Sequence, residues 1–129
     1  MPYLKNEFET WIKSITRNNG EYYSSETINN YINVVKNYCK KLNNLSITNS
    51  DLFFVDNISD FESIHSKILN HPDFEQVNQA YHRAFSSGLL IYKRFLQFKE
   101  TERMKTELSF EQWLVSYQTD SEACFFVDL

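Results

Sequence analysis

The sequence contains very few residues that break regular structure: only two of its 129 residues are glycine and only two are proline. Because tight turns depend on these residues, the scarcity disfavours a many-stranded sheet or barrel and favours long helices. The length fits one domain, and a hydrophobic content of 42% provides a core without disulfides or metals. We therefore expect an all-α fold, a compact bundle of about five helices.

Cysteine and long hydrophobic runs are also scarce. The two cysteines, Cys39 and Cys124, lie far apart and match no metal-binding spacing. No apolar run approaches the roughly 20 residues of a membrane span, and the N-terminal residues enter an amphipathic segment without a signal peptide. These absences predict a cytoplasmic protein with reduced thiols and no membrane contact.

No catalytic constellation is visible in the sequence. The glycines Gly20 and Gly88 are isolated, so a glycine-rich phosphate loop is excluded. The histidines His65, His71 and His82 have no metal-ligand spacing, and neither a G-x-S-x-G nor an H-E-x-x-H motif occurs. We therefore expect a protein that is not an enzyme and that holds no cofactor and no metal.

Hydrophobic periodicity predicts the order of the helices. A first helix is expected over residues 3–17, and a second, capped by Ser24 or Ser25, runs to about Leu42. The segment 52–55 is predicted to be short and extended, and capping boxes at Ser59 and Ser109 predict two further helix starts. We expect a bundle domain over residues 1–106. Residues 107–129 then form a C-terminal helix and tail that pack on the bundle or begin a further module.

The centre of the bundle is predicted to be one long amphipathic helix over residues 78–98. Winding the segment at about 100° per residue gathers its hydrophobic residues and Gly88 on one stripe. That stripe consists of Tyr81, Phe85, Gly88, Leu89, Tyr92, Phe95 and Leu96. The opposite face carries basic and hydrogen-bonding side chains.

Two polar helix faces are the candidate binding surfaces. The second helix presents Asn33, Lys36, Asn37 and Lys40, and the central helix presents Arg83, Lys93 and Arg94. Lysine, arginine and asparagine are side chains that bond phosphates and base edges, although a solvated helix face has the same composition. The net charge of −4 argues against binding DNA with the whole surface, and it leaves room for one local basic face.

Exposed aromatic or apolar groups are expected beside these faces, at Tyr22, Tyr23 and Leu90. Such groups either stack on nucleic-acid bases or contact another protein. The sequence pattern alone leaves both interpretations open.

The order of landmarks over residues 5–98 resembles a known family. The landmarks are Phe8-x-x-Trp11-Ile12, Ser25-Glu26-Thr27-Ile28-x-x-Tyr31, Leu52-Phe53, Phe61-x-x-Ile64, Pro72-x-Phe74, Asn78, His82, Phe85-Ser86 and Leu89-x-x-Tyr92-x-x-Phe95-Leu96. This order resembles a small helical module at the N-terminus of many bacterial restriction and defence proteins, which carry McrB-like GTPase, HNH or other nuclease domains further on. The segment 25–31 is also similar to the start of the core-binding, SAM-like domain of tyrosine recombinases, whose catalytic residues have no counterpart here.

The resemblance implies a non-catalytic DNA-binding or targeting module of a prokaryotic restriction or antiviral defence system. Its partners would be DNA and a nuclease or NTPase subunit or domain. One alternative is a protein–protein interaction module or a small phage-encoded inhibitor of a host defence complex, which suits the acidic balance better. Another is an enzyme whose site forms only in an oligomer.

Overall fold

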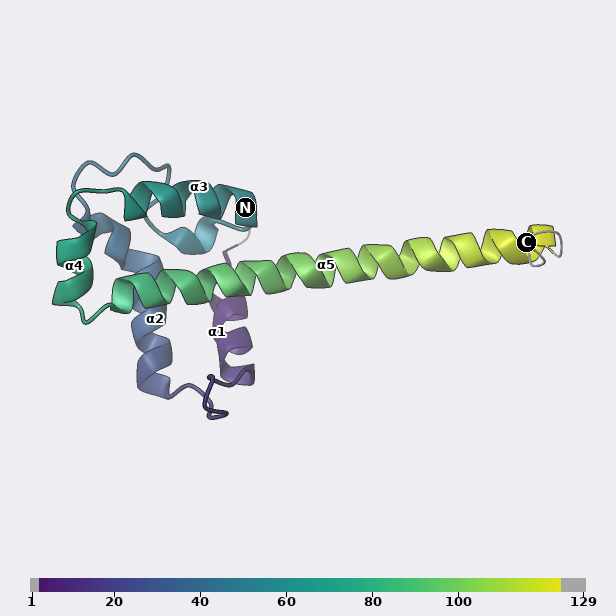
Figure 1. Cartoon of the computed structure of the whole chain (residues 1–129), viewed down its shortest axis with the longest axis horizontal. Coiled ribbons are helices and arrows are strands. Elements are labelled where there is room, and N and C mark those ends of the chain that lie inside the picture. The colour runs from purple at the N-terminus through teal and green to yellow at the C-terminus, as the bar shows by residue number, and fades with distance from the viewer. Residues whose placement is uncertain (1–2, 124–129) are drawn as a thin grey trace. The chain divides into compact units, whose positions relative to one another are not determined.

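The protein is an all-α protein in a computed structural model that describes the backbone of residues 3–123 and the side chains of residues 3–105 (Figure 1). Within the described chain the only β-type pairing is an isolated bridge between Thr16 and Tyr22. The five α-helices and two 3₁₀ turns are α1 (Lys5–Ser14), α2 (Ser25–Asn37), η1 (Tyr38–Lys41), η2 (Leu52–Phe54), α3 (Ile58–Leu69), α4 (Phe74–Ala80) and α5 (Ala84–Ala123). The predicted helical fold class is thereby confirmed.

The chain divides into two compact units, Met1–Gln97 and Phe98–Leu129. The bundle domain expected from the sequence covers residues 1–106, and that domain boundary stays a prediction. The first unit is the helical bundle. The predicted packing of residues 107–129 involves side chains that lie outside the described residues. The backbone of the tail 124–129 lies outside them as well.

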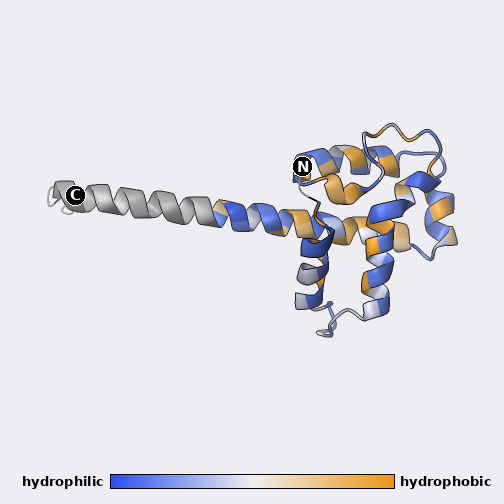
Figure 2. Ribbon diagram, turned by 180° about the vertical axis from the view of Figure 1, so that it is seen from behind, coloured by the Kyte–Doolittle hydropathy of each residue, from blue (hydrophilic) through white to orange (hydrophobic). Residues whose placement is uncertain are grey.

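The first half of α5 is the element around which the bundle is built. In Figure 1, α1 and α2 lie on one side of it and α3 lies on the other. Figure 2 shows hydrophobic and hydrophilic residues interspersed along these helices, and the hydrophobic ones form one buried core cluster. The predicted stripe is buried from Phe85 to Leu96, whereas Tyr81 is 40% exposed.

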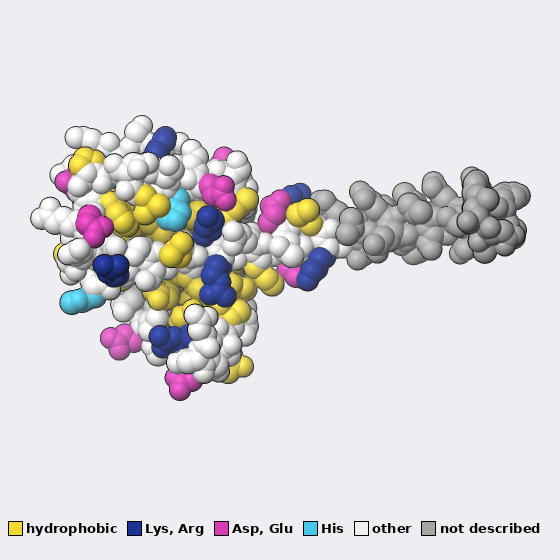
Figure 3. All heavy atoms as spheres, viewed as in Figure 1, with side chains coloured by type: hydrophobic (Ala, Val, Ile, Leu, Met, Phe, Trp, Pro, Cys, Tyr) yellow, Lys and Arg dark blue, Asp and Glu magenta, His cyan; other side chains and the backbone are white. Residues whose placement is uncertain are grey.

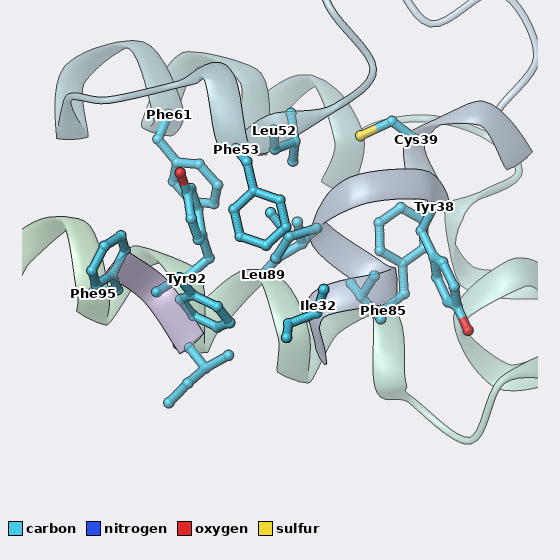
Figure 4. Packing of buried hydrophobic residues seen from close by; sticks show 14 of the residues in the cluster. Ile32, Tyr38, Cys39, Leu52, Phe53, Phe61, Phe85, Leu89, Tyr92 and Phe95 are labelled. Atoms are coloured by element: carbon cyan, nitrogen blue, oxygen red, sulfur yellow. The ribbon is translucent and has the colours of Figure 1, made fainter. Parts of the chain in front are cut away.

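The core is rich in aromatic rings, and Tyr92 of α5 lies at its centre (Figure 4). Its ring contacts those of Phe8, Phe53, Phe61 and Phe95, with centroids 5.5–5.7 Å apart. Its hydroxyl donates a hydrogen bond of 2.9 Å to the carbonyl of Val55. A buried tyrosine needs such a partner, so this contact joins α5 to the segment before α3.

Helices α2 and α5 approach each other closely at Gly88. A Cβ atom on this glycine would lie 2.6 Å from Cγ1 and 2.8 Å from Cβ of Val34, which is fully buried. The glycine therefore permits a backbone-to-side-chain contact that no other residue allows at this distance.

The prediction of one helix over residues 78–98 is wrong, because the chain breaks between α4 and α5. His82 and Arg83 have φ angles of 54° and 65°, a left-handed conformation that is unfavourable for residues other than glycine. The side chain of Asn78 accepts a 3.0 Å hydrogen bond from the Ser86 backbone N–H and donates one of 3.1 Å to the Ser86 hydroxyl. Asn78 thus caps the start of α5 from the preceding helix and stabilises the break.

Other predicted boundaries also change. The first helix, α1, is shorter than the predicted residues 3–17. The second, α2, ends at Asn37 and is followed by the 3₁₀ turn η1 before Leu42. In the segment 52–55, which was predicted to be extended, residues 52–54 form the 3₁₀ turn η2 and only Val55 is extended. Asp51 caps this turn by accepting a hydrogen bond from the Phe53 N–H.

Neither predicted capping box marks the start of a helix. Helix α3 begins at Ile58, and its N-cap is Asn57, whose side chain accepts from the Asp60 N–H at 2.8 Å. The second predicted start, Ser109, lies inside α5, which continues through it to Ala123. The N-terminal cap at Ser24 is confirmed by its 3.1 Å bond from the Thr27 N–H.

Candidate nucleic-acid interface

The three predicted cations of the central helix do not form one patch. Arg83 precedes α5 in the strained turn. Arg94 lies eleven residues further on, which at 1.5 Å per helical residue is about 16 Å along the helix. Lys93 and Arg94 are neighbours in sequence, but successive helical residues point about 100° apart. They consequently reach different flanks of α5.

Lys93 lies on the α3 flank and has an acidic partner there. Its Nζ atom is 3.9 Å from Glu62 Oε1, and its side chain is only 30% exposed. His65, also on α3, has its pKa lowered by burial and further lowered by the charge of Lys93, while Glu62 opposes the shift. This part of the predicted basic face is therefore partly compensated.

Arg94 reaches the opposite flank, where it lines a polar cleft of about 320 Å³. The cleft is lined by Arg17, Asn18, Asn19, Tyr23, Tyr31 and Arg94. These residues come from the loop after α1, from α2 and from α5. The fold thus brings together two guanidinium groups that are far apart in sequence.

The loop between α1 and α2 is held in a fixed turn that positions Arg17. The Arg17 N–H donates to the carbonyl of Glu21 at 2.7 Å, and the Gly20 N–H donates to the carbonyl of Arg17 at 2.9 Å. Gly20 has a φ of 84°, which suits glycine. This turn follows the end of α1 at Ser14.

The aromatic wall of the cleft interacts with its cationic rim. The guanidinium of Arg17 lies 5.8 Å from the ring centroid of Tyr23, within cation–π range. The rings of Tyr23 and Tyr31 meet edge to face at 6.1 Å. Burial raises the pKa of Tyr31, as does Tyr23, while the charge of Arg17 opposes the shift. The Tyr31 phenol is therefore neutral near pH 7 and retains an O–H donor.

The two guanidinium groups of the cleft have no acidic partner among residues 3–105. None of the carboxylates in that range lies within 4.0 Å of Arg17 or Arg94. The excess of acidic residues also lies outside the first unit. Residues 1–97 carry ten Lys or Arg and ten Asp or Glu, whereas residues 98–129 carry three Lys or Arg and seven Asp or Glu. The bundle is thus neutral overall, and its cleft is locally positive.

The predicted face of α2 is only partly preserved. Asn37 donates a 2.7 Å hydrogen bond to the side-chain oxygen of Asn33, so these two amides partly satisfy each other. Lys36 is half-buried on the last turn of α2, and Lys40 is exposed but lies in η1, beyond the end of the helix. None of the four residues lines the cleft.

The predicted aromatic and apolar contact residues are exposed to different degrees. Tyr22 is 66% exposed and Leu90 is 54% exposed, whereas Tyr23 is half-buried in the cleft. On the face seen in Figure 3, Lys and Arg side chains lie beside hydrophobic surface near α5. The sequence did not predict Arg17, Asn18 and Asn19 as site residues, because they lie in a loop without helical periodicity.

Two further features bear on the classes of function. Within the described residues, no group of three or more His, Cys, Asp or Glu side chains is arranged to hold a metal ion. None of the described helices combines the length and the apolar character needed to cross a bilayer. A second hollow, of about 390 Å³, lies beside α3 and is lined by apolar and acidic side chains such as Phe54, Ile64 and Asp60.

The fold and the cleft define an all-α bundle with a small basic site. Comparisons with protein-family models, with curated proteins and with solved structures find no match to the chain.

Proposed function

We propose that this chain is a non-catalytic helical module that binds nucleic acid, with DNA as its ligand. The observation that carries the proposal is the cleft that both Arg17 and Arg94 line without a carboxylate partner among the described residues. Two uncompensated guanidinium groups, with asparagine and tyrosine donors beside them, form a site suited to a phosphate group. Arg94 was predicted for this role from the sequence, and Arg17 adds the second cation.

The biological setting is part of the same proposal. The order of landmarks over residues 5–98 supports a targeting module of a prokaryotic restriction or antiviral defence system, acting with a nuclease or NTPase in the cytoplasm. The hydrophobic part of that pattern coincides with buried core positions such as Phe8, Phe61 and Tyr92, so it supports the fold more strongly than the partner.

Salt-dependent binding tests the proposal. The 129-residue chain is titrated against a fluorescent DNA oligonucleotide, both duplex and single-stranded, at about 50 and 200 mM salt. We expect binding that weakens with salt, because phosphate contacts release counterions. The Arg17→Ala/Arg94→Ala variant should lose at least about tenfold in affinity and show a salt slope smaller by up to about two.

A matched control removes the same charge elsewhere. Lys5→Ala/Lys67→Ala changes two lysines of the first unit that do not line the cleft, and it should bind nearly as well as the parent chain. Absence of binding to either DNA at low salt would refute the proposal, because electrostatic attraction is strongest there.

Exposed Leu90 supports a second candidate, a protein–protein interaction module. Its side chain is 54% exposed on α5, between the strained turn and the cleft. A partner that covers this leucine would remove apolar surface from water, which is favourable. If neither DNA binds, Leu90→Ser and Tyr22→Ser are the variants with which to seek loss of association with a defence-complex subunit.

A further inference from the structure

We propose that the Arg17–Arg94 cleft recognises single-stranded nucleic acid, holding one backbone phosphate between the two guanidinium groups while the ring of Tyr22 stacks on the adjoining base. This inference rests on the proposed function and names the form of nucleic acid that the same site takes. Three observations carry it: the concave shape of the cleft, the small number of cations and the placement of the two tyrosines.

The shape favours a flexible strand. The cleft has a volume of about 320 Å³, at the lower end of the range of small-ligand pockets. It therefore admits one nucleotide-sized group and not a length of helix. A duplex keeps its bases paired and presents its phosphates on a convex cylinder, whereas a single strand can bend a phosphate into a hollow.

The charge favours the same conclusion. The first unit has equal numbers of basic and acidic residues, and Lys93 is paired with Glu62. Duplex binding without sequence preference depends on many phosphate contacts across a broad basic surface. Single-strand sites combine a positively charged groove with aromatic rings that stack on bases, and the cleft has both arginines and tyrosines.

The two neighbouring tyrosines differ in where their side chains lie. Tyr22 pairs with Thr16 in the isolated bridge, so the backbone is extended there and adjacent side chains point to opposite sides. Tyr23 turns into the cleft, where it meets Arg17 and Tyr31. Tyr22 turns outward, is 66% exposed and stacks on no other ring among residues 3–105. Its ring is therefore free to stack on a base that lies outside the cleft, one residue along the chain from Tyr23 of the cleft wall.

The donors of the loop complete the site. The side-chain oxygen of Asn19 accepts the Glu21 N–H at 3.0 Å, which fixes the amide and leaves its NH₂ group as a donor. The Tyr31 O–H adds a neutral donor on the opposite wall. These groups can bond a phosphate oxygen that the two arginines hold.

Anisotropy titration of the full chain with labelled oligothymidylate and with a blunt duplex of equal length tests the inference. We expect the single strand to bind at least about tenfold more tightly. Tyr22→Ala should lower its affinity roughly tenfold, the effect of losing one stacked base, while Tyr22→Phe should retain binding because the ring remains. Arg17→Ala and Arg94→Ala should each weaken binding of the single strand, and Lys67→Ala should not.

The outcomes separate this inference from the proposed function. Equal or tighter binding of the duplex would overturn the single-strand inference and leave the proposed function standing. Single-strand binding that Tyr22→Ala leaves unchanged would overturn the stacking arrangement. Absence of binding to both oligonucleotides would overturn the inference together with the proposed function. Because Tyr22, Arg17 and Arg94 are exposed, circular dichroism should show the native helical content in every variant.

Discussion

Lys93 and Arg94 are adjacent cations on the same helix, but their side chains lie on different flanks of α5 and have different surroundings. On the α3 flank, Lys93 is half-buried beside Glu62 and His65. On the α2 flank, Arg94 is exposed in a cleft with a second arginine. The comparison shows that a helical wheel identifies a polar face, but that the neighbouring elements determine which of its charges remain available to a ligand.

The largest expected effect on the α2 flank comes from adding a side chain at Gly88, where α5 contacts α2. Gly88→Ala should destabilise the bundle by about 1–3 kcal/mol, because the added Cβ meets the stiff, fully buried Val34 side chain. In an open helix the same change would stabilise by up to about 1 kcal/mol. Urea unfolding monitored by circular dichroism measures the difference.

Two variants make that result specific. Ser87→Ala, at the exposed neighbouring position, should change stability by less than about 0.5 kcal/mol. Val34→Ala should recover part of the loss when combined with Gly88→Ala, since the pair is in direct contact. A Gly88→Ala chain as stable as the parent would show that α2 and α5 do not approach closely at this point.

The α3 flank should respond to pH through His65. Its pKa is lowered in the folded chain, first by burial and then by Lys93. The unfolded chain therefore binds a proton at a higher pH than the folded one, so this contribution to stability is complete above about pH 6.5 and is lost as the pH falls through the folded pKa. The free energy of unfolding should fall over that window, and His65→Gln should flatten the fall.

A proton titration followed by NMR checks the cause. Lys93→Ala should raise the pKa of His65, because the charge of Lys93 lowers it in the parent chain. An unchanged His65 pKa in that variant would mean that Lys93 does not face α3.

The smallest expected effect comes from releasing Lys93 from its acidic partner. Glu62→Gln removes the partner of Lys93, so that cation becomes more available and DNA affinity should rise roughly twofold, in keeping with the small energy of an exposed ion pair. Glu75→Gln on α4 removes an equal charge at another exposed site. If both variants gain equally, the gain reflects net charge alone and not the release of Lys93.

The buried side of the bundle was predictable from spacing. Phe85, Leu89 and Tyr92 follow the helical period, and each is fully buried. The break before α5 was not predictable in this way, because the helical period continues through Tyr81 and neither glycine nor proline marks the turn. The break depends on the Asn78–Ser86 hydrogen bonds, a contact between residues eight apart.

The candidate site was predictable only in part. Arg94 follows from its position on a polar helix face, and Tyr22 and Tyr23 from their aromatic character. Arg17 lies in a loop, and its significance comes from a turn that brings it to α5. The pairing of Lys93 with Glu62 likewise joins two helices. Contacts of this kind arise from tertiary packing and leave no local pattern in a single sequence.

The most direct test of this account compares Arg94→Ala with Lys93→Ala in one binding experiment on single-stranded DNA. Both variants remove one positive charge from the same helix at consecutive positions. We expect a loss of about tenfold for Arg94→Ala and less than about twofold for Lys93→Ala. Equal losses would mean that α5 binds through its overall charge and that the cleft has no special role.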